Sequence, residues 1–68
     1  MITTIKSGYV KKYDYDWRVL EFTDTNGSLP VYAVERNQGE HDGRFFIVSV
    51  TPSKELALHK ADMLFGGK

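Results

Sequence analysis

Apolar and polar residues alternate along most of the chain, and this period of two is typical of β-strands. The alternating segments are separated by stretches rich in Gly, Asn and Asp, which favour turns. The pattern predicts four strands, over residues 2–12, 17–24, 30–36 and 44–50. Because the connections are short, successive strands are expected to pair antiparallel as a meander.

The connections carry recognisable turn signals. Tyr13-Asp14-Tyr15-Asp16 is expected to turn, because Asp tolerates turn geometry. The Asn-Gly pair within Thr25-Asn26-Gly27-Ser28 favours a type I′ hairpin. Residues 37–43 are polar, contain two glycines and predict a longer hairpin loop. Gly8 predicts a β-bulge, and Pro30 is expected at the start of its strand or on an edge because it cannot donate to a ladder.

The period changes near the C-terminus, where a helix is expected over residues 52–65. Thr51 suits the N-cap and Pro52 the first helical position, and two glycines end the helix. One helical face collects small and apolar residues, namely Ala57, Leu58, Ala61, Leu64 and Phe65. The sequence therefore predicts an α+β fold, a four-stranded antiparallel β-meander with one C-terminal α-helix packed on one face (ββββα), forming a single domain over residues 1–68.

The same alternation predicts which side chains face the helix. The inward set is expected to be Leu20, Phe22, Phe46, Val48 and Val50, with residues 44–50 as a central strand because they are the most apolar. Leu64 is expected to dock on the sheet, so that Leu64→Ala costs about 2–5 kcal/mol. One helix covers only one face, so large apolar side chains remain on the other. That face is expected to be an interface, or to be covered by coiling of the sheet or by its loops.

Composition and charge limit the classes of function that this chain can have. Nine Lys and Arg balance nine Asp and Glu, so the chain lacks the basic excess that proteins binding duplex nucleic acid usually show. The absence of cysteine excludes disulfides and Cys-based zinc sites. No apolar run approaches the roughly 20 residues that span a bilayer, and no export signal is visible at the N-terminus. We therefore expect a cytoplasmic protein that does not contact a membrane.

Candidate catalytic chemistry is sparse. Glu40, His41 and Asp42 are neighbours in a loop, and such neighbours rarely converge on one metal ion. His59 lies on the polar helix face beside Glu55, without a nucleophile near it in the pattern. The glycines of the 37–43 loop match no phosphate-binding motif. We therefore expect no enzymatic activity, no cofactor and no metal site, and both histidines should be dispensable.

Aromatic residues and cations interleave between Tyr9 and Arg18. Tyr, Trp and Arg together are typical of protein-binding hot spots, although aromatic side chains among cations also bind single-stranded nucleic acid. Asp14 and Asp16 would repel a phosphate backbone, which favours a protein partner. The predicted partner-binding surface joins this stretch to the helix-free face of the sheet and comprises Tyr13, Tyr15, Trp17, Arg18, Val19, Phe45 and Ile47.

The sequence thus predicts a small non-catalytic module that docks on a larger protein and modulates it, with inhibition as the expected mode. By size and architecture alone, such modules are associated with accessory proteins of phages and mobile elements. A homodimer built on the same face is an alternative use of the surface. The alternative function is binding of single-stranded nucleic acid by the aromatic sheet face.

Overall fold

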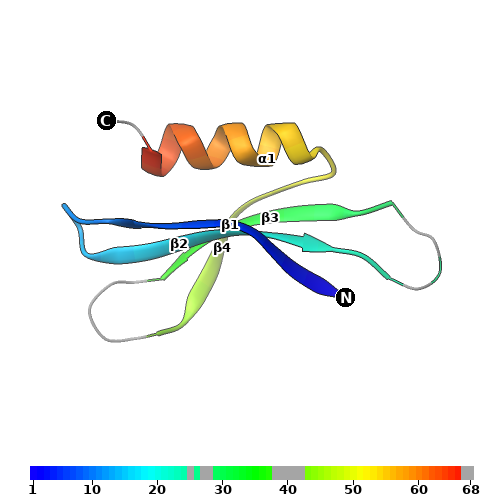
Figure 1. Ribbon diagram of the computed structural model, residues 1–68, viewed down its shortest axis with the longest axis horizontal. Coiled ribbons are helices and arrows are strands. Elements are labelled where there is room, and N and C mark those ends of the chain that lie inside the picture. Colours follow the sequence, from blue (N-terminus) through cyan, green and yellow to red (C-terminus); the bar gives the residue numbers. More distant parts are fainter. Residues whose placement is uncertain (25, 27–28, 38–42, 67–68) are drawn as a thin grey trace.

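Four antiparallel strands form one open sheet in the order β1-β2-β3-β4, and a helix lies across one face of it (Figure 1). The computed structural model describes residues 1–24, 26, 29–37 and 43–66. The strands are β1 (Ile2–Val10), β2 (Tyr15–Phe22), β3 (Val31–Asn37) and β4 (Phe45–Thr51), and the helix is α1 (Lys54–Ala61), continued by a π-helical turn η1 (Asp62–Gly66). The predicted ββββα layout is confirmed.

Cross-strand pairing sorts the side chains onto two faces, because residues opposite each other in a sheet point to the same side. The helix face, which packs against α1, contains the row Gly8, Trp17, Arg36 and Phe46 and the row Lys6, Val19, Val34 and Ser49. The open face, on the other side, contains the rows Ile2, Phe22 and Val31; Thr4, Leu20, Ala33 and Val50; and Ser7, Arg18, Glu35 and Ile47.

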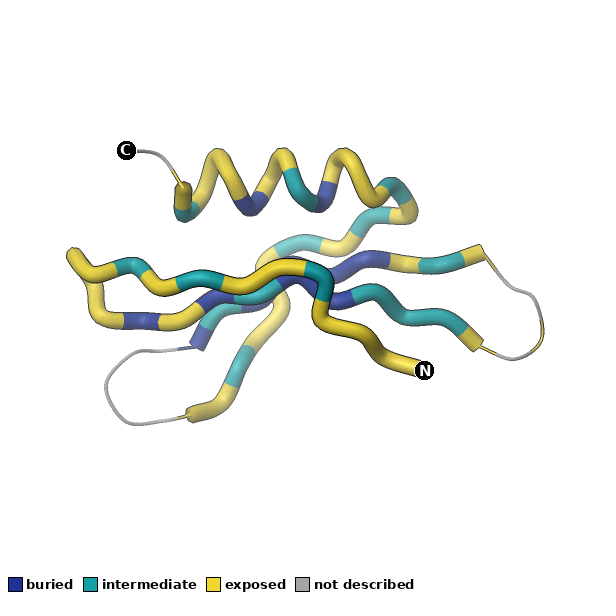
Figure 2. The backbone as a smooth tube through the Cα atoms, viewed as in Figure 1, coloured by how far each residue is buried: buried dark blue, intermediate teal, exposed yellow. Residues whose placement is uncertain are grey.

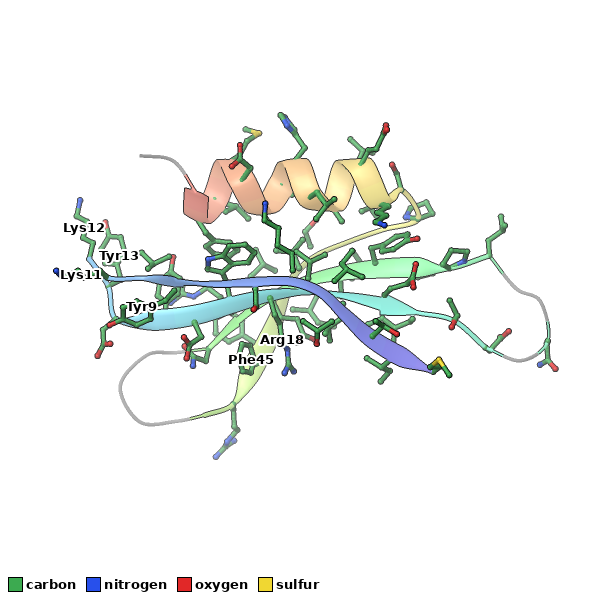
Figure 3. All side chains as sticks on the ribbon, in the orientation of Figure 1. Tyr9, Lys11, Lys12, Tyr13, Arg18 and Phe45 are labelled. Atoms are coloured by element: carbon green, nitrogen blue, oxygen red, sulfur yellow. The ribbon has the colours of Figure 1, made fainter. Side chains whose placement is uncertain are left out.

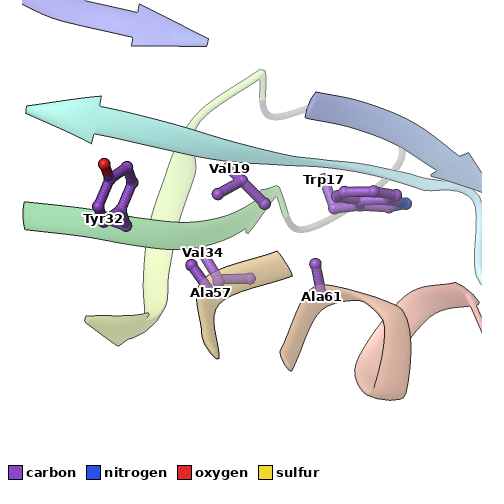
Figure 4. Packing of buried hydrophobic residues seen from close by; sticks show 6 residues of the cluster. All are labelled: Trp17, Val19, Tyr32, Val34, Ala57 and Ala61. Carbon is purple, nitrogen blue, oxygen red and sulfur yellow. The ribbon is translucent and has the colours of Figure 1, made fainter. Parts of the chain in front are cut away.

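The core lies between the helix face and α1. It is one buried cluster, made of Trp17, Val19, Tyr32, Val34, Ala57 and Ala61 (Figure 4). The two alanines let the helix backbone approach the sheet. Gly8 makes room on the sheet side, since a Cβ placed there would lie 2.6 Å from the indole of Trp17. Gly8 is therefore not the predicted bulge, which in β1 falls instead between Thr4 and Lys6.

This core reverses the predicted orientation of β2. Trp17 and Val19 face the helix, whereas Leu20 and Phe22 lie on the open face. The fit around the indole accounts for this orientation: Trp17 lies opposite Gly8 and against the small side chains of Ala57 and Ala61, which leave room for the ring. Leu20 is buried nonetheless, at the middle of the open face of a strongly twisted sheet (Figure 1).

The prediction that residues 44–50 form a central strand is wrong, because β4 is the last strand of the meander and lies at its edge. A register shift opposite Val34 and Glu35 leaves Val48 as the extra residue of a bulge. Phe46 faces the helix side as predicted, but the bulge inverts the alternation beyond it. Val50 consequently lies on the open face, contrary to the prediction.

The turns also differ from the prediction in position. The first turn covers residues 11–14, where Asp14 has a positive φ of 58° and its N–H donates to the carbonyl of Val10. β1 therefore ends two residues earlier than expected, and β2 begins two residues earlier. The predicted Asn-Gly turn and most of the 37–43 loop lie outside the described residues, apart from Asn26, Asn37 and Gly43.

The helix begins later than predicted. Ser53, not Thr51, is its N-cap, and the Ser53 hydroxyl accepts from the N–H of Leu56 at 3.2 Å. The wide π turn after Ala61 advances each residue by a smaller angle than an α-helix does. Phe65 therefore stays in line with Ala61 and stacks on Trp17 at 5.2 Å, while Leu64 is 48% exposed. The predicted docking of Leu64 is wrong, and its truncation should cost much less than a buried leucine would.

Candidate protein-binding surface

The seven residues predicted to bind a partner are divided between two sides of the sheet. Tyr15, Trp17 and Val19 are buried on the helix face, none more than 8% exposed. Tyr13 lies in the first turn, stacked on Tyr15 with ring centroids 6.1 Å apart. The structure brings together on the open face only Arg18, Phe45 and Ile47. The prediction that all seven form one surface is therefore wrong.

Arg18 is held in a fixed position on the open face. Its Nε donates to Oε1 of Glu35 at 2.8 Å, and its guanidinium carbon lies 3.8 Å from the centroid of the Phe45 ring. The ion pair and the cation–π contact act on the same side chain from two directions. Glu35 is buried and Arg18 is partly exposed. We call these three residues the Arg18 cluster.

A shallow groove of about 380 Å³ lies beside the Arg18 cluster. Tyr9 forms part of its wall and exposes about half of its side chain. The Tyr9 hydroxyl donates to Oδ1 of Asp14, and this hydrogen bond raises the pKa of Tyr9. Figure 3 shows Tyr9, Arg18 and Phe45 on the side of the sheet away from α1, with Lys11 and Lys12 at the first turn.

The rest of the open face is an apolar strip. Its exposed members are Ile2, Val31, Ile47 and Val50, each between 39% and 62% exposed. They surround the buried pair Leu20 and Ala33, which belong to adjacent strands. In Figure 2 exposed segments predominate along β4 and the N-terminal part of β1. The open face therefore offers apolar contact area next to one fixed cation.

The described residues give little support to other kinds of site. Within them there is no group of three or more His, Cys, Asp or Glu side chains that could hold a metal ion. His59 is exposed on α1, and the Glu40-His41-Asp42 segment lies outside the described residues. No helix in the described ranges has the length and apolar character needed to cross a membrane.

The chain matches no protein-family model, no curated protein and no solved structure. The assignment of a site therefore rests on the geometry above.

The predicted surface missed several residues of the open face, among them Glu35, Tyr9 and Val50. Glu35 had a usable signal, because a two-residue turn centred on the Asn-Gly pair places Arg18 opposite Glu35, as observed. Opposite charges on facing residues of one sheet face predict an ion pair. Val50 had no such signal, because the bulge that turns it outward depends on the pairing of β3 with β4.

Proposed function

We propose that this chain is a small non-catalytic protein-binding module that docks on a larger protein through its open face. The observation that supports this most directly is the apolar strip beside the Arg18 cluster. Protein interfaces combine an apolar centre with a polar rim, and arginine is enriched among the residues that dominate their affinity. A contiguous exposed apolar patch on a small domain also indicates an interaction site.

The proposed partner presents an apolar surface bordered by carboxylates. Arg18 is already fixed by Glu35 and Phe45, so little side-chain entropy is lost when its guanidinium meets a second carboxylate. Lys11 and Lys12 are exposed at the first turn, beyond Tyr9 (Figure 3). Their charge would speed the association of an acidic edge, most strongly at low ionic strength.

Docking of this kind covers surface on the partner, so inhibition is the proposed mode of modulation. We place this activity in the cytoplasm, a proposal supported by the absence of cysteine from the sequence. The association with phage and mobile-element accessory proteins stays a hypothesis based on size and architecture.

The experiment compares three versions of the chain as bait: wild type, Val31→Lys and Leu29→Lys. Val31 lies on the open face in an interior strand, whereas Leu29 is 84% exposed in the preceding connection. A protein retained by wild type and Leu29→Lys should be lost by Val31→Lys. Its dissociation constant, measured by calorimetry after purification, should rise about thirtyfold or more for Val31→Lys, as loss of a hot spot does. Equal affinities of the partner for wild type and Val31→Lys would exclude the open face as the binding surface.

Binding of single-stranded nucleic acid is the second candidate function, favoured by one observation. Tyr9 and Tyr13 each expose more than half of their side chains, and Lys12 Nζ lies 5.3 Å from the Tyr13 ring centroid. Exposed rings beside cations stack on bases and neutralise phosphates. A labelled oligonucleotide should then bind with a steep loss of affinity as salt rises, and Tyr9→Ala should weaken it. No detectable binding of the oligonucleotide at low salt would exclude this function.

A further inference from the structure

We propose that the open face binds an extended segment of the partner in which a basic, an acidic and an apolar residue follow one another at every second position, with the acidic one in the middle. This inference rests on the proposed function and adds the charge pattern that the partner carries. It is supported by the order of charged and apolar side chains along β2, which is an interior strand of the sheet.

Alternate residues of β2 give the open face a fixed order of side chains. Asp16, Arg18 and Leu20 belong to this face, since Trp17 and Val19 pack toward the helix. Asp16 is exposed, Arg18 is partly exposed, and Leu20 lies at the centre of the apolar strip. The face therefore changes from acidic to basic to apolar in steps of two residues, each about 7 Å along the strand.

The basic position has hydrogen-bonding capacity left for a carboxylate. A guanidinium group carries five N–H donors, and among the residues that the structure describes Arg18 donates to Glu35 through Nε alone. Ser7, opposite Arg18 on β1, adds an exposed hydroxyl beside it. Glu35 and Phe45 hold Arg18 in place before binding, so a carboxylate of the partner meets the remaining donors at a small entropic cost.

The acidic position consists of Asp16 and Tyr9, which are paired across β2 and β1. Asp16 accepts a long hydrogen bond of 3.4 Å from Nδ2 of Asn37 and forms no ion pair within the described residues. The Tyr9 ring is 56% exposed, and its hydroxyl is held by Asp14. An ammonium or guanidinium group bound here gains a carboxylate and an aromatic ring together.

One groove joins the two charged positions. Asp16, Tyr9 and Arg18 all line the groove of about 380 Å³, so a cation and a carboxylate of one segment bind there side by side. An extended chain presents alternate side chains at the interval that separates Asp16 from Arg18, and its next one reaches the apolar strip. A segment with carboxylates only would bring one of them against Asp16, and this contact between like charges costs affinity.

Two capped synthetic peptides of the same composition test the proposal by NMR titration of the isotopically labelled full chain. The matching peptide is Lys-Thr-Glu-Thr-Val-Thr-Val, and the exchanged peptide is Glu-Thr-Lys-Thr-Val-Thr-Val. Threonine and valine favour an extended conformation. The matching peptide should shift amide signals of the open face and bind about tenfold more tightly, because the exchanged peptide places like charges against Asp16 and Arg18.

Asp16→Asn removes one charge and keeps the size of the side chain. It should weaken binding of the matching peptide about fivefold. Glu55→Gln is the matched control, because Glu55 is exposed on α1, on the other side of the sheet, and should leave both affinities unchanged. Arg18→Gln combined with Glu35→Gln removes the ion pair without leaving a buried charge alone, and should weaken the matching peptide by a similar factor. Should this double variant fail to fold, Asp16→Asn decides.

Equal affinities for the two peptides, or no shifts from either at millimolar concentration, would overturn the proposal. Shifts confined to α1 would overturn it too. Open-face shifts that depend on the concentration of the chain alone would assign this face to a second copy and would also overturn it. The proposed function fails separately, when Val31→Lys retains the partner that wild type binds. A partner lost by Val31→Lys, with no preference between the peptides, would leave the proposed function standing and show that the charge pattern is wrong.

Discussion

The two faces of the sheet receive similar apolar side chains from β2 but use them differently. On the helix face Trp17 and Val19 are almost completely buried beneath a helix that contributes two alanines. On the open face, Leu20 and Ala33 are the apolar side chains among the described residues that reach that burial, and Ile47 and Val50 stay more than half exposed. Hydrophobicity is therefore a poor guide to which face holds the core. The complementarity between small helical residues and large sheet residues decides it.

Truncation of Trp17 should give the largest difference in stability between the two faces. Trp17→Ala removes the ring that packs on Gly8 and stacks on Phe65, and should cost about 3–5 kcal/mol, much of the stability of so small a domain. Ile47→Ala, on the open face, should cost about 1 kcal/mol because the side chain is largely exposed. Urea unfolding followed by circular dichroism measures both. Equal costs would show that the two faces contribute equally to the core.

A methyl group added at Gly8 tests the contact between Gly8 and Trp17 from the β1 side. Gly8→Ala places a Cβ 2.6 Å from the Trp17 ring, and overpacking of this kind costs about 1–3 kcal/mol. Ser7→Ala is the matched control, because Ser7 neighbours Gly8 but lies on the open face in the row of Arg18. It should change the free energy of unfolding by no more than about 0.5 kcal/mol. A neutral Gly8→Ala would mean that the indole moves aside without loss of packing.

Much of the fold could be predicted from the sequence, because each element has a local cause. The period of two, the turn-forming residues and the change of period before α1 all act within a few residues. The orientation of β2 could not be predicted in this way, since Leu20 and Phe22 suit a core as well as Trp17 and Val19 do. The bulge at Val48 depends on pairing with β3 and leaves no local signal. The edge position of β4 was available from the predicted meander, but its apolar sequence favoured a central strand.

The candidate surface was predicted less well for the same reason. Arg18, Phe45 and Ile47 were identified and do lie together, since Arg18 contacts Phe45 and pairs with Glu35 in the row of Ile47. The aromatic residues chosen as anchors became core once β2 was turned over. A binding surface is what the core leaves uncovered, so an error in the orientation of one strand moves the predicted site to the opposite face.

The smallest expected effect is on the pH dependence of stability, and it involves two tyrosines, one on each face of the sheet. Tyr32, in the core, donates its hydroxyl to Oε2 of Glu21 at 2.8 Å, and this hydrogen bond, with burial and the charge of Glu21, raises the pKa of Tyr32. The folded pKa then lies above the unfolded value of about 10. The stabilisation is fully present below that value and is lost as the pH rises through the folded pKa.

The melting temperature of wild type should therefore fall above about pH 10 more steeply than that of Tyr32→Phe, which has no phenol to ionise. Tyr9→Phe is the control on the open face. In wild type the hydrogen bond to Asp14 raises the pKa of Tyr9, but the Tyr9 ring is exposed and solvent screens the interaction. Loss of the Tyr9 hydroxyl should therefore change the pH dependence of the melting temperature less than loss of the Tyr32 hydroxyl does. Thermal melts of the three proteins from about pH 8 to about pH 11 separate these contributions from the titration of lysines, which all three share. Parallel curves for wild type and Tyr32→Phe would show that the Tyr32–Glu21 hydrogen bond does not contribute to stability.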